Sequence, residues 1–164
     1  MPQDSIDLLQ AMPLFGGVSE ASLHLLLRSA QKLVLSRGEF FFREHEPGAS
    51  MFVLREGRVG IVKSWAGRDY LLRYLEAGDC FGEMALLDLY PRSASIVAVD
   101  KCTAIEIPTD SLHQLYQHDL EQFALIFMNI GRELSRRLRD ADQRLFERAM
   151  TPHAADDPDL PRVI

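Results

Sequence analysis

Residues 81–95 read Phe81-Gly82-Glu83-Met84-Ala85-Leu86-Leu87-Asp88-Leu89-Tyr90-Pro91-Arg92-Ser93-Ala94-Ser95, and this stretch decides how the rest of the chain is interpreted. The run from 83 to 87 consists of good helix formers, and the glycine before it lets the backbone approach a ligand closely. The first amides of such a helix lack intrahelical partners and carry the positive end of the helix dipole. The stretch therefore predicts a short helix whose beginning binds an anion.

The second half of the stretch adds side-chain donors. Pro91 fixes its own φ angle and keeps Tyr90 away from the helical region, so the chain turns back here. Arg92 then offers a planar guanidinium that suits phosphate oxygens, and the hydroxyl of Ser93 adds a further donor. Glu83 would repel an anion unless it faces a donor such as a sugar hydroxyl. A sugar and a phosphate together indicate a nucleotide.

The whole string resembles the phosphate-binding cassette of the cyclic-nucleotide-binding domains, a family that includes the catabolite activator protein and the regulatory subunits of cyclic-AMP-dependent kinase. We call residues 81–95 the cassette. The resemblance implies that Glu83 binds the ribose 2′-hydroxyl and that Arg92 and Ser93 bind the cyclic phosphate. The candidate nucleotide-binding residues are Phe81, Gly82, Glu83, Met84, Ala85, Arg92, Ser93 and Ala94. The alternative is a plain helical connection in which Arg92 pairs with Glu83 or Asp88.

Length, charge and cysteine content limit the class of protein. A chain of 164 residues suits one compact domain with an extra element. The net charge of −6 repels polyanions in general, so any anion site must be local. Cys80 and Cys102 form no metal or redox motif, residues 1–4 show no signal pattern, and no apolar run is long enough to span a membrane. We therefore expect a soluble, reduced, cytoplasmic protein.

The hydrophobic pattern predicts a mainly β fold with flanking helices. Two short helical segments lie before residue 28, and Ser19 is placed to cap the second. From residue 31 to 107, alternating segments and glycine turns recur at short intervals, which is typical of about eight strands in a jelly-roll-like β-barrel, also called a double-stranded β-helix. The predicted division is 1–119 for this barrel with its N-terminal helices, 120–148 for a long C-terminal helix and 149–164 for a disordered, acidic, proline-containing tail.

A metal-dependent or other catalytic site has little support in the sequence. His45-Glu46-Pro47 lacks the second histidine of the metal motif that cupin enzymes carry on a similar barrel. His113 and His118 do not share one helical face, and no nucleophile with a base or pair of carboxylates stands out. We expect neither a metal, a cofactor nor an enzymatic activity, and a bound cyclic phosphate would simply be held.

The segment 120–148 carries two apolar faces. Eight of its residues follow intervals of four and three, the spacing of a coiled-coil seam. We call them the seam; they are Leu120, Ala124, Phe127, Gly131, Leu134, Leu138, Ala141 and Leu145. Phe123, Ile126 and Ile130 form a second stripe that would face the barrel. The seam predicts a homodimer through residues 120–148, unless both stripes lie against one broad core.

The segment carries six arginines, at positions 132, 136, 137, 139, 144 and 148. Acidic residues interleave with them, and Glu133 and Arg137 form an ordinary i,i+4 pair, so we interpret them as a solvated face. Aligning Arg136-Arg137-Leu138 with the similar stretch of the family gives Leu138, Ala141 and Asp142 as weaker candidates for contacts to the base. Asp142 can accept a hydrogen bond from adenine or from guanine, so the base preference stays open.

We expect no DNA-binding module, because the residues after 149 are too few for the helix-turn-helix that follows this helix in the transcription factors of the family. The favoured function is a regulatory receptor in signal transduction that binds cAMP, or alternatively cGMP, and acts on a separate effector protein without membrane contact. The alternative is a structural or dimerisation module of the same fold that no longer binds nucleotide.

Overall fold

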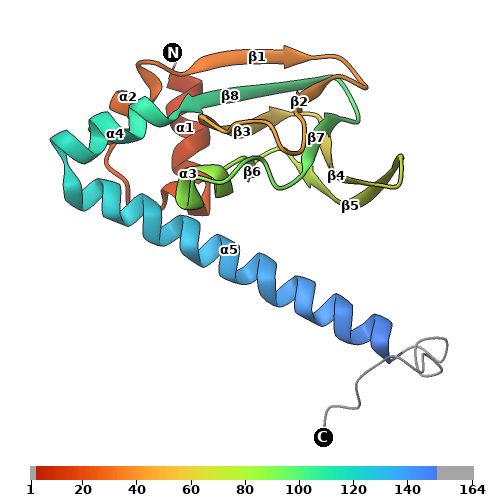
Figure 1. Ribbon diagram of the computed structural model, residues 1–164. Helices are drawn as coiled ribbons and strands as arrows, with labels where there is room; N and C mark the ends of the chain where they lie inside the picture. The colour runs from red at the N-terminus through yellow and green to blue at the C-terminus, as the bar shows by residue number, and fades with distance from the viewer. Residues whose placement is uncertain (1–2, 151–164) are drawn as a thin grey trace, which may run out of the picture.

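The computed structural model describes residues 3–150, and Figure 1 shows their arrangement. Short helices open the chain: α1 (Gln3–Ala11), the 3-10 turn η1 (Pro13–Phe15) and α2 (Glu20–Leu27). The predicted cap of α2 is confirmed, because the Oγ of Ser19 accepts a hydrogen bond from the amide of Ser22 at 3.2 Å. The strands follow, and α4 (Thr109–His118) and α5 (Leu120–Ala149) close the described part.

Within residues 3–150, eight strands form two four-stranded antiparallel sheets. The predicted jelly-roll-like fold is thus confirmed, built from two separate sheets. The first has the order β1 (Gln31–Leu35), β8 (Cys102–Pro108), β3 (Ser50–Glu56) and β6 (Cys80–Phe81). The second has the order β2 (Phe40–Phe42), β7 (Ser95–Ala98), β4 (Arg58–Trp65) and β5 (Arg68–Glu76). Because β6 and β7 belong to different sheets, the cassette between them links the two sheets.

The two sheets enclose an aromatic core directly behind the cassette. Phe81, the first cassette residue, stacks on Phe52 of β3 with ring centroids 5.2 Å apart, and Phe41 meets it edge-on at 5.0 Å. Phe42 of β2 completes this group. Such contacts bury apolar area and also favour defined ring orientations. The start of the cassette is therefore anchored in the core.

A second core lies between the first sheet and the helices. Met51 and Val53 of β3 and Ile105 and Ile107 of β8 belong to it, whereas the alternate residues Phe52, Leu54 and Ala104 belong to the aromatic core. Strands β3 and β8 are therefore covered on both faces, which explains their nearly continuous burial. The helical partners come from α1, η1, α2, α4, the first half of α5 and the short helix α3 (Met84–Asp88), which contributes Leu86.

Helix α5 is the longest element, 30 residues or about 45 Å at the usual rise. Its start is capped by the carboxylate of Asp119, which accepts from the amide of Gln122 at 3.0 Å. Ile126 and Ile130 are fully buried against the helical core, as predicted for the second stripe, and Phe123 is partly buried there. The second half of α5 diverges from the sheets (Figure 1) and exposes Leu138 and Leu145 of the seam.

The predicted tail at 149–164 lies outside the described residues, apart from Ala149, the last residue of α5, and Met150. Within residues 3–150, no helix combines the length and the hydrophobicity that a bilayer crossing requires.

The buried stripe of α5 is what attaches this helix to the body. We expect Ile126→Ala to lower the free energy of unfolding by about 2–5 kcal/mol, because it opens a cavity at a fully buried site. Met128→Ala is the matched control: that side chain is more than half exposed, so its loss should cost less than about 0.5 kcal/mol. Chemical denaturation of both variants measures the difference. Equal effects would contradict the assignment of the buried face.

Candidate functional site

The backbone of the cassette follows the sequence prediction closely. Helix α3 (Met84–Asp88) begins soon after Gly82, and Leu89 ends it in the left-handed region with φ of 58°. Gly82 itself has φ of 81°, a conformation that other residues rarely adopt. A Cβ atom at this position would lie 2.7 Å from Nη1 of Arg92 and would displace it. The glycine is therefore required by both the turn and the close approach of the arginine.

Arg92 is nearly buried, and its guanidinium is held by backbone carbonyls. Nη1 donates to the carbonyl oxygen of Gly82 and Nη2 to that of Ser50, each at 2.8 Å. The guanidinium also lies over the ring of Phe42, 4.0 Å from its centroid. Burial lowers the pKa of Arg92 below its ordinary value, and nearby carboxylates, first among them that of Glu106, oppose this effect. The sequence predicted an arginine at this site but not its carbonyl partners.

The main chain on both sides of Arg92 is fixed by the loop between β2 and β3. The amide of His45 donates to the carbonyl of Arg92 at 2.9 Å, and the amide of Arg92 donates to the carbonyl of Glu46 at 2.9 Å. This pair of hydrogen bonds holds the residue in register with a loop far away in the sequence. The position of the guanidinium is thus determined by the backbone as well as by its own contacts.

Glu83 is a buried carboxylate with one paired and one unpaired oxygen. Oε1 accepts from Nη1 of Arg137 at 2.7 Å, and Oε2 is buried without a hydrogen-bond partner. Burial raises the pKa of Glu83 above its ordinary value, and the positive charge of Arg137 partly offsets the increase. A buried acceptor without a donor is unfavourable, so this oxygen favours a ligand that supplies one.

Arg137 reaches the cassette from α5. Besides Glu83, its Nη2 donates to the carbonyl oxygen of Cys80 at 2.9 Å, and its Nε donates to Oε1 of Glu133 at 2.9 Å. The predicted i,i+4 pair with Glu133 is therefore present, but the interpretation of Arg137 as part of a solvated face is wrong. Its spacing along α5 could not reveal a partner 54 residues away.

A cavity of about 90 Å³ lies between the cassette, the second sheet and α5. Two of the lining residues each carry a buried polar atom without a hydrogen-bond partner, namely Nε of Arg92 and Oε2 of Glu83. The cavity is smaller than the roughly 300 Å³ of ordinary ligand pockets, so it encloses only part of a nucleotide unless side chains move. All eight predicted binding residues line it, together with Phe42, Ile61, Ile96 and Arg137.

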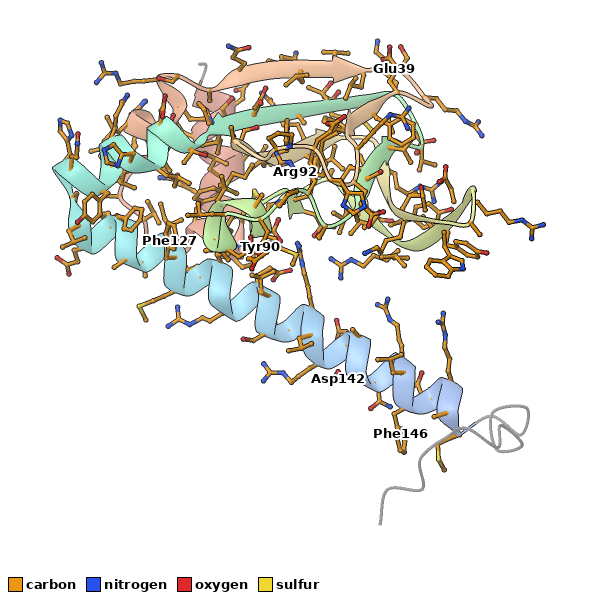
Figure 2. The ribbon with its side chains drawn as sticks, viewed as in Figure 1. Glu39, Tyr90, Arg92, Phe127, Asp142 and Phe146 are labelled. Carbon is orange, nitrogen blue, oxygen red and sulfur yellow. The ribbon has the colours of Figure 1, made fainter. Side chains whose placement is uncertain are left out.

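The weaker candidates for base contacts do not line this cavity. Leu138, Ala141 and Asp142 are exposed on α5, and Figure 2 shows Asp142 on the part of that helix beyond the sheets. Ser93 does line the cavity, and its hydroxyl donates to the sulfur of Met84 at 3.7 Å. Among residues 3–150, no cluster of histidine, cysteine or acidic side chains could hold a metal ion.

The thiol of Cys80 lies beneath the same site. Burial, with a further contribution from Glu83, raises its pKa to about 12. The sulfur is therefore a neutral thiol near pH 7 and has no nucleophilic role there.

The sequence model of the cyclic nucleotide-binding domain matches residues 32–119, which is more than half of the chain. The chain belongs to the cyclic nucleotide-binding domain family. The match includes the whole cassette and both sheets except for the first residue of β1.

Two curated relatives and one solved structure illustrate the similarity. The cyclic AMP receptor protein of Thermus thermophilus is 30% identical over 138 residues, which cover 84% of this chain and 62% of the receptor. The cGMP-dependent protein kinase 2 of Homo sapiens is 31% identical over 98 residues, which cover 58% of this chain and 13% of the kinase. The chain thus spans less than two thirds of either relative. A cyclic nucleotide-binding domain from Methylobacillus flagellatus shares the fold, with a TM-score of 0.78, 23% identity and coverage of 89% of this chain and 83% of that one.

The raised pKa of Glu83 gives this cyclic nucleotide-binding domain a defined pH response. The folded state holds a proton on this carboxyl more tightly than the unfolded state, so its contribution to stability falls as pH rises from the ordinary glutamate range through the raised pKa. We expect Glu83→Gln to remove this decrease in the free energy of unfolding. Denaturant titrations across that range measure it, with the exposed Glu121→Gln as control. A wild-type profile identical to that of Glu83→Gln would contradict the assignment.

Proposed function

We propose that this chain is a regulatory receptor that binds a cyclic nucleotide in the cavity beside the cassette. The observation that carries the proposal is that two residues lining the cavity each hold a buried atom without a hydrogen-bond partner, one an acceptor and the other a donor. Oε2 of Glu83 is an acceptor that suits a ribose hydroxyl, and Nε of Arg92 is a donor that suits a phosphate oxygen. A cyclic nucleotide carries both groups close together.

Each binding residue has a defined role in this proposal. Arg92 supplies charge-assisted hydrogen bonds to the cyclic phosphate, and Ser93 adds its hydroxyl. Glu83 holds the ribose, and the main chain of residues 82–85 lies against the phosphate. Phe81, Met84, Ala85 and Ala94 provide the apolar walls. Nothing in this set activates water or a leaving group, so the ligand is held without chemical change and the protein is not an enzyme.

The favoured ligand is cAMP, with cGMP as the alternative. The relative named as a cyclic AMP receptor aligns with 84% of this chain, whereas the cGMP-dependent kinase aligns with 58%. Base preference depends on residues beyond the cassette, and Leu138, Ala141 and Asp142 remain the candidates on α5. These three residues reach a base only when α5 moves or when a second chain supplies them, because they lie outside the cavity.

The response to the ligand passes through α5. Arg137 lines the cavity and pairs with Glu83, so a nucleotide bound there meets the side chain that joins α5 to the cassette. The ligand shifts the equilibrium between two positions of α5 only as far as its affinity for them differs. We propose that α5 dimerises through residues 120–148 and that its position controls a separate effector protein in the cytoplasm, without direct contact with DNA or membrane.

A module of the same fold without nucleotide binding is the second candidate. Arg92 already has carbonyl partners and Glu83 has Arg137, so this site is partly satisfied without a ligand. The unpartnered atoms favour the receptor. The affinity measurements below separate the two functions.

Arg92→Leu should lower cyclic-nucleotide affinity by roughly tenfold or more, because charge-assisted hydrogen bonds to phosphate are lost. Calorimetric titration with cAMP and then cGMP, on protein checked for bound nucleotide, measures the loss. Arg43→Leu is the matched control, since that exposed arginine stacks on Phe40 and does not line the cavity. Circular dichroism confirms that each variant is folded. Unchanged affinity in folded Arg92→Leu would refute the cassette assignment.

Leu138→Glu should convert the dimer to a monomer, because it places a charge in the seam. Sedimentation velocity over a range of concentrations measures the change. Phe146→Glu is the control: Phe146 is 60% exposed, close to the 63% of Leu138, but lies outside the seam and points away from the body in Figure 2. A wild type that is monomeric at high concentration would refute the dimer.

A further inference from the structure

A second hollow, separate from the nucleotide cavity, is a groove between η1 and α5. Its volume is about 760 Å³, within the range of ordinary ligand pockets. Its apolar lining includes Pro13 and Met128, and its charged lining consists of Arg132, Arg136 and Arg139. We call these three arginines the arginine face. The roles assigned so far to α5 make no use of this groove.

The arginine face points away from the seam. The three arginines follow intervals of four and three residues, so they share one side of the helix. Each stands two residues before a seam residue, namely 134, 138 or 141. Two residues turn an α-helix by about 200°, which places the two faces on nearly opposite sides. Dimerisation through the seam would therefore leave the groove open to another partner.

Arg132 is held in position by a buried asparagine. Asn129 is only 7% exposed, and its Nδ2 donates to the carbonyl oxygen of Gly16 at 3.0 Å. Its Oδ1 accepts from Nη1 of Arg132 at 2.8 Å. The amide of Asn129 thus joins the loop after η1 to the guanidinium. This bond uses one of the five N–H donors of an arginine, and the side chain of Arg132 is exposed, so it can bind a ligand as well.

Positive charge is concentrated in the groove, although the whole chain carries a net charge of −6. Glu133 pairs with Arg136, but the same carboxylate also accepts from Nε of Arg137 at 2.9 Å. One negative charge is therefore shared between two arginines. Within residues 3–150, Arg139 is exposed and forms neither a hydrogen bond nor an ion pair. The groove keeps a net positive charge that suits an acidic ligand.

We propose that this groove binds a short acidic peptide segment, with an apolar residue at one end, that belongs to the effector protein. The assignment of the peptide to the effector rests on the proposed function, whereas the binding itself does not require nucleotide. The inference goes further than that function by naming the surface of α5 that meets the partner and the chemistry of the partner's segment.

The spacing of the charges favours a peptide. Arg132 and Arg139 lie seven residues apart, or about 10.5 Å along the helix axis, which is more than one phosphate or carboxylate group spans. In an extended peptide, alternate side chains repeat about every 6.6 Å on one face. Acidic residues at alternate positions therefore match the length of the arginine face. An apolar residue beside them can pack on Met128, because methionine side chains adapt to different contacts.

A long nucleic acid suits the same groove less well. The net negative charge of the chain repels an extended polyanion, whose many phosphates would lie over acidic surface beyond the groove. A peptide of a few residues meets only the local positive charge. Charge complementarity thus favours the short acidic segment.

Glu133 connects the groove to the nucleotide site. It pairs with Arg136 on one side and with Arg137 on the other, and Nη1 of Arg137 donates to Glu83 at 2.7 Å. A nucleotide that changes the pairing of Arg137 with Glu83 also changes how Glu133 is shared between its two arginines. The affinities for nucleotide and peptide are therefore linked, and each ligand changes the affinity of the other by the same factor.

Fluorescence anisotropy with a labelled synthetic peptide tests the groove. The probe is Leu-Ser-Asp-Ser-Asp-Ser-Asp, and the control peptide has asparagine in place of each aspartate. At low ionic strength the acidic probe should bind about tenfold more tightly than the control peptide. The double variant Arg132→Gln and Arg139→Gln should lower the affinity for the acidic probe about fivefold, because two charge pairs are lost.

The matched control variant is Arg37→Gln combined with Arg68→Gln. It makes the same change in net charge at two exposed arginines that do not line the groove. This variant should bind the acidic probe as the wild type does. Equal losses in the two double variants would show that only net charge matters and would overturn the proposal. Circular dichroism shows whether each variant is folded.

Nuclear magnetic resonance of the isotope-labelled protein locates the bound probe. Amide signals from residues 128–139 should shift, whereas shifts confined to the cassette would place the acidic peptide at Arg92 and refute the groove. A single-stranded DNA oligonucleotide that binds more tightly than the probe, through the same arginines, would assign the groove to nucleic acid instead. Tighter binding of the probe after Asp156→Asn, Asp157→Asn and Asp159→Asn would assign it to the chain's own acidic segment.

The two proposals fail separately. Failure of the Arg92→Leu prediction removes the receptor function and leaves the groove standing, because the probe is titrated without nucleotide. Loss of discrimination between the acidic probe and its control peptide, with nucleotide binding intact, removes only the groove. Saturating cAMP should change the dissociation constant of the probe in the wild type, and Glu133→Gln should remove most of that change. An unchanged constant in a wild type that binds cAMP would refute the link through Glu133.

Discussion

The rest of the site depends on the buried guanidinium of Arg92. A charge in the interior is costly unless its donors are satisfied, and here the carbonyls of Gly82 and Ser50 satisfy two of them. This contact requires the backbone to come very close. A Cβ on Gly48 would lie 2.4 Å from that of Ala85 and 3.1 Å from the guanidinium, so glycine is needed there as well as at Gly82. The arginine thereby fixes the cassette to β3 and to the loop before it.

Glu83 and Arg92 carry opposite charges and line one cavity, yet they do not pair with each other. Glu83 pairs instead with Arg137, and Arg92 with neutral carbonyls. Direct pairing of Glu83 with Arg92, the alternative raised by the sequence, would have occupied acceptor and donor sites that are now left for a ligand. Separation of the pair keeps one unsatisfied atom on each side chain. The two unsatisfied atoms lower the stability of the folded protein. A ligand that presents a hydroxyl and a phosphate together would recover this stability.

The sequence predicted those features that depend on neighbouring residues. The short helix after Gly82, the turn before Pro91 and the cap at Ser19 follow from local propensity, and the structure confirms them. The alternating pattern likewise predicted the strands of both sheets. Arg137 was missed because its surroundings in sequence are those of an exposed helix, and only the fold brings it to Glu83. The carbonyl partners of Arg92 have no sequence signal at all, because every residue carries a carbonyl.

Arg137 also explains why the two halves of α5 are attached to the body in different ways. The first half is attached to the body by buried side chains such as Ile126, which cost too much to expose in a routine conformational change. The second half is held mainly by the polar contacts of Arg137. Hydrogen bonds to charged groups contribute only about 1.5–3 kcal/mol each, an amount that a ligand can replace. Under the proposed function, a change at Glu83 would therefore act on the second half of α5 through Arg137, while the buried first half stays in place.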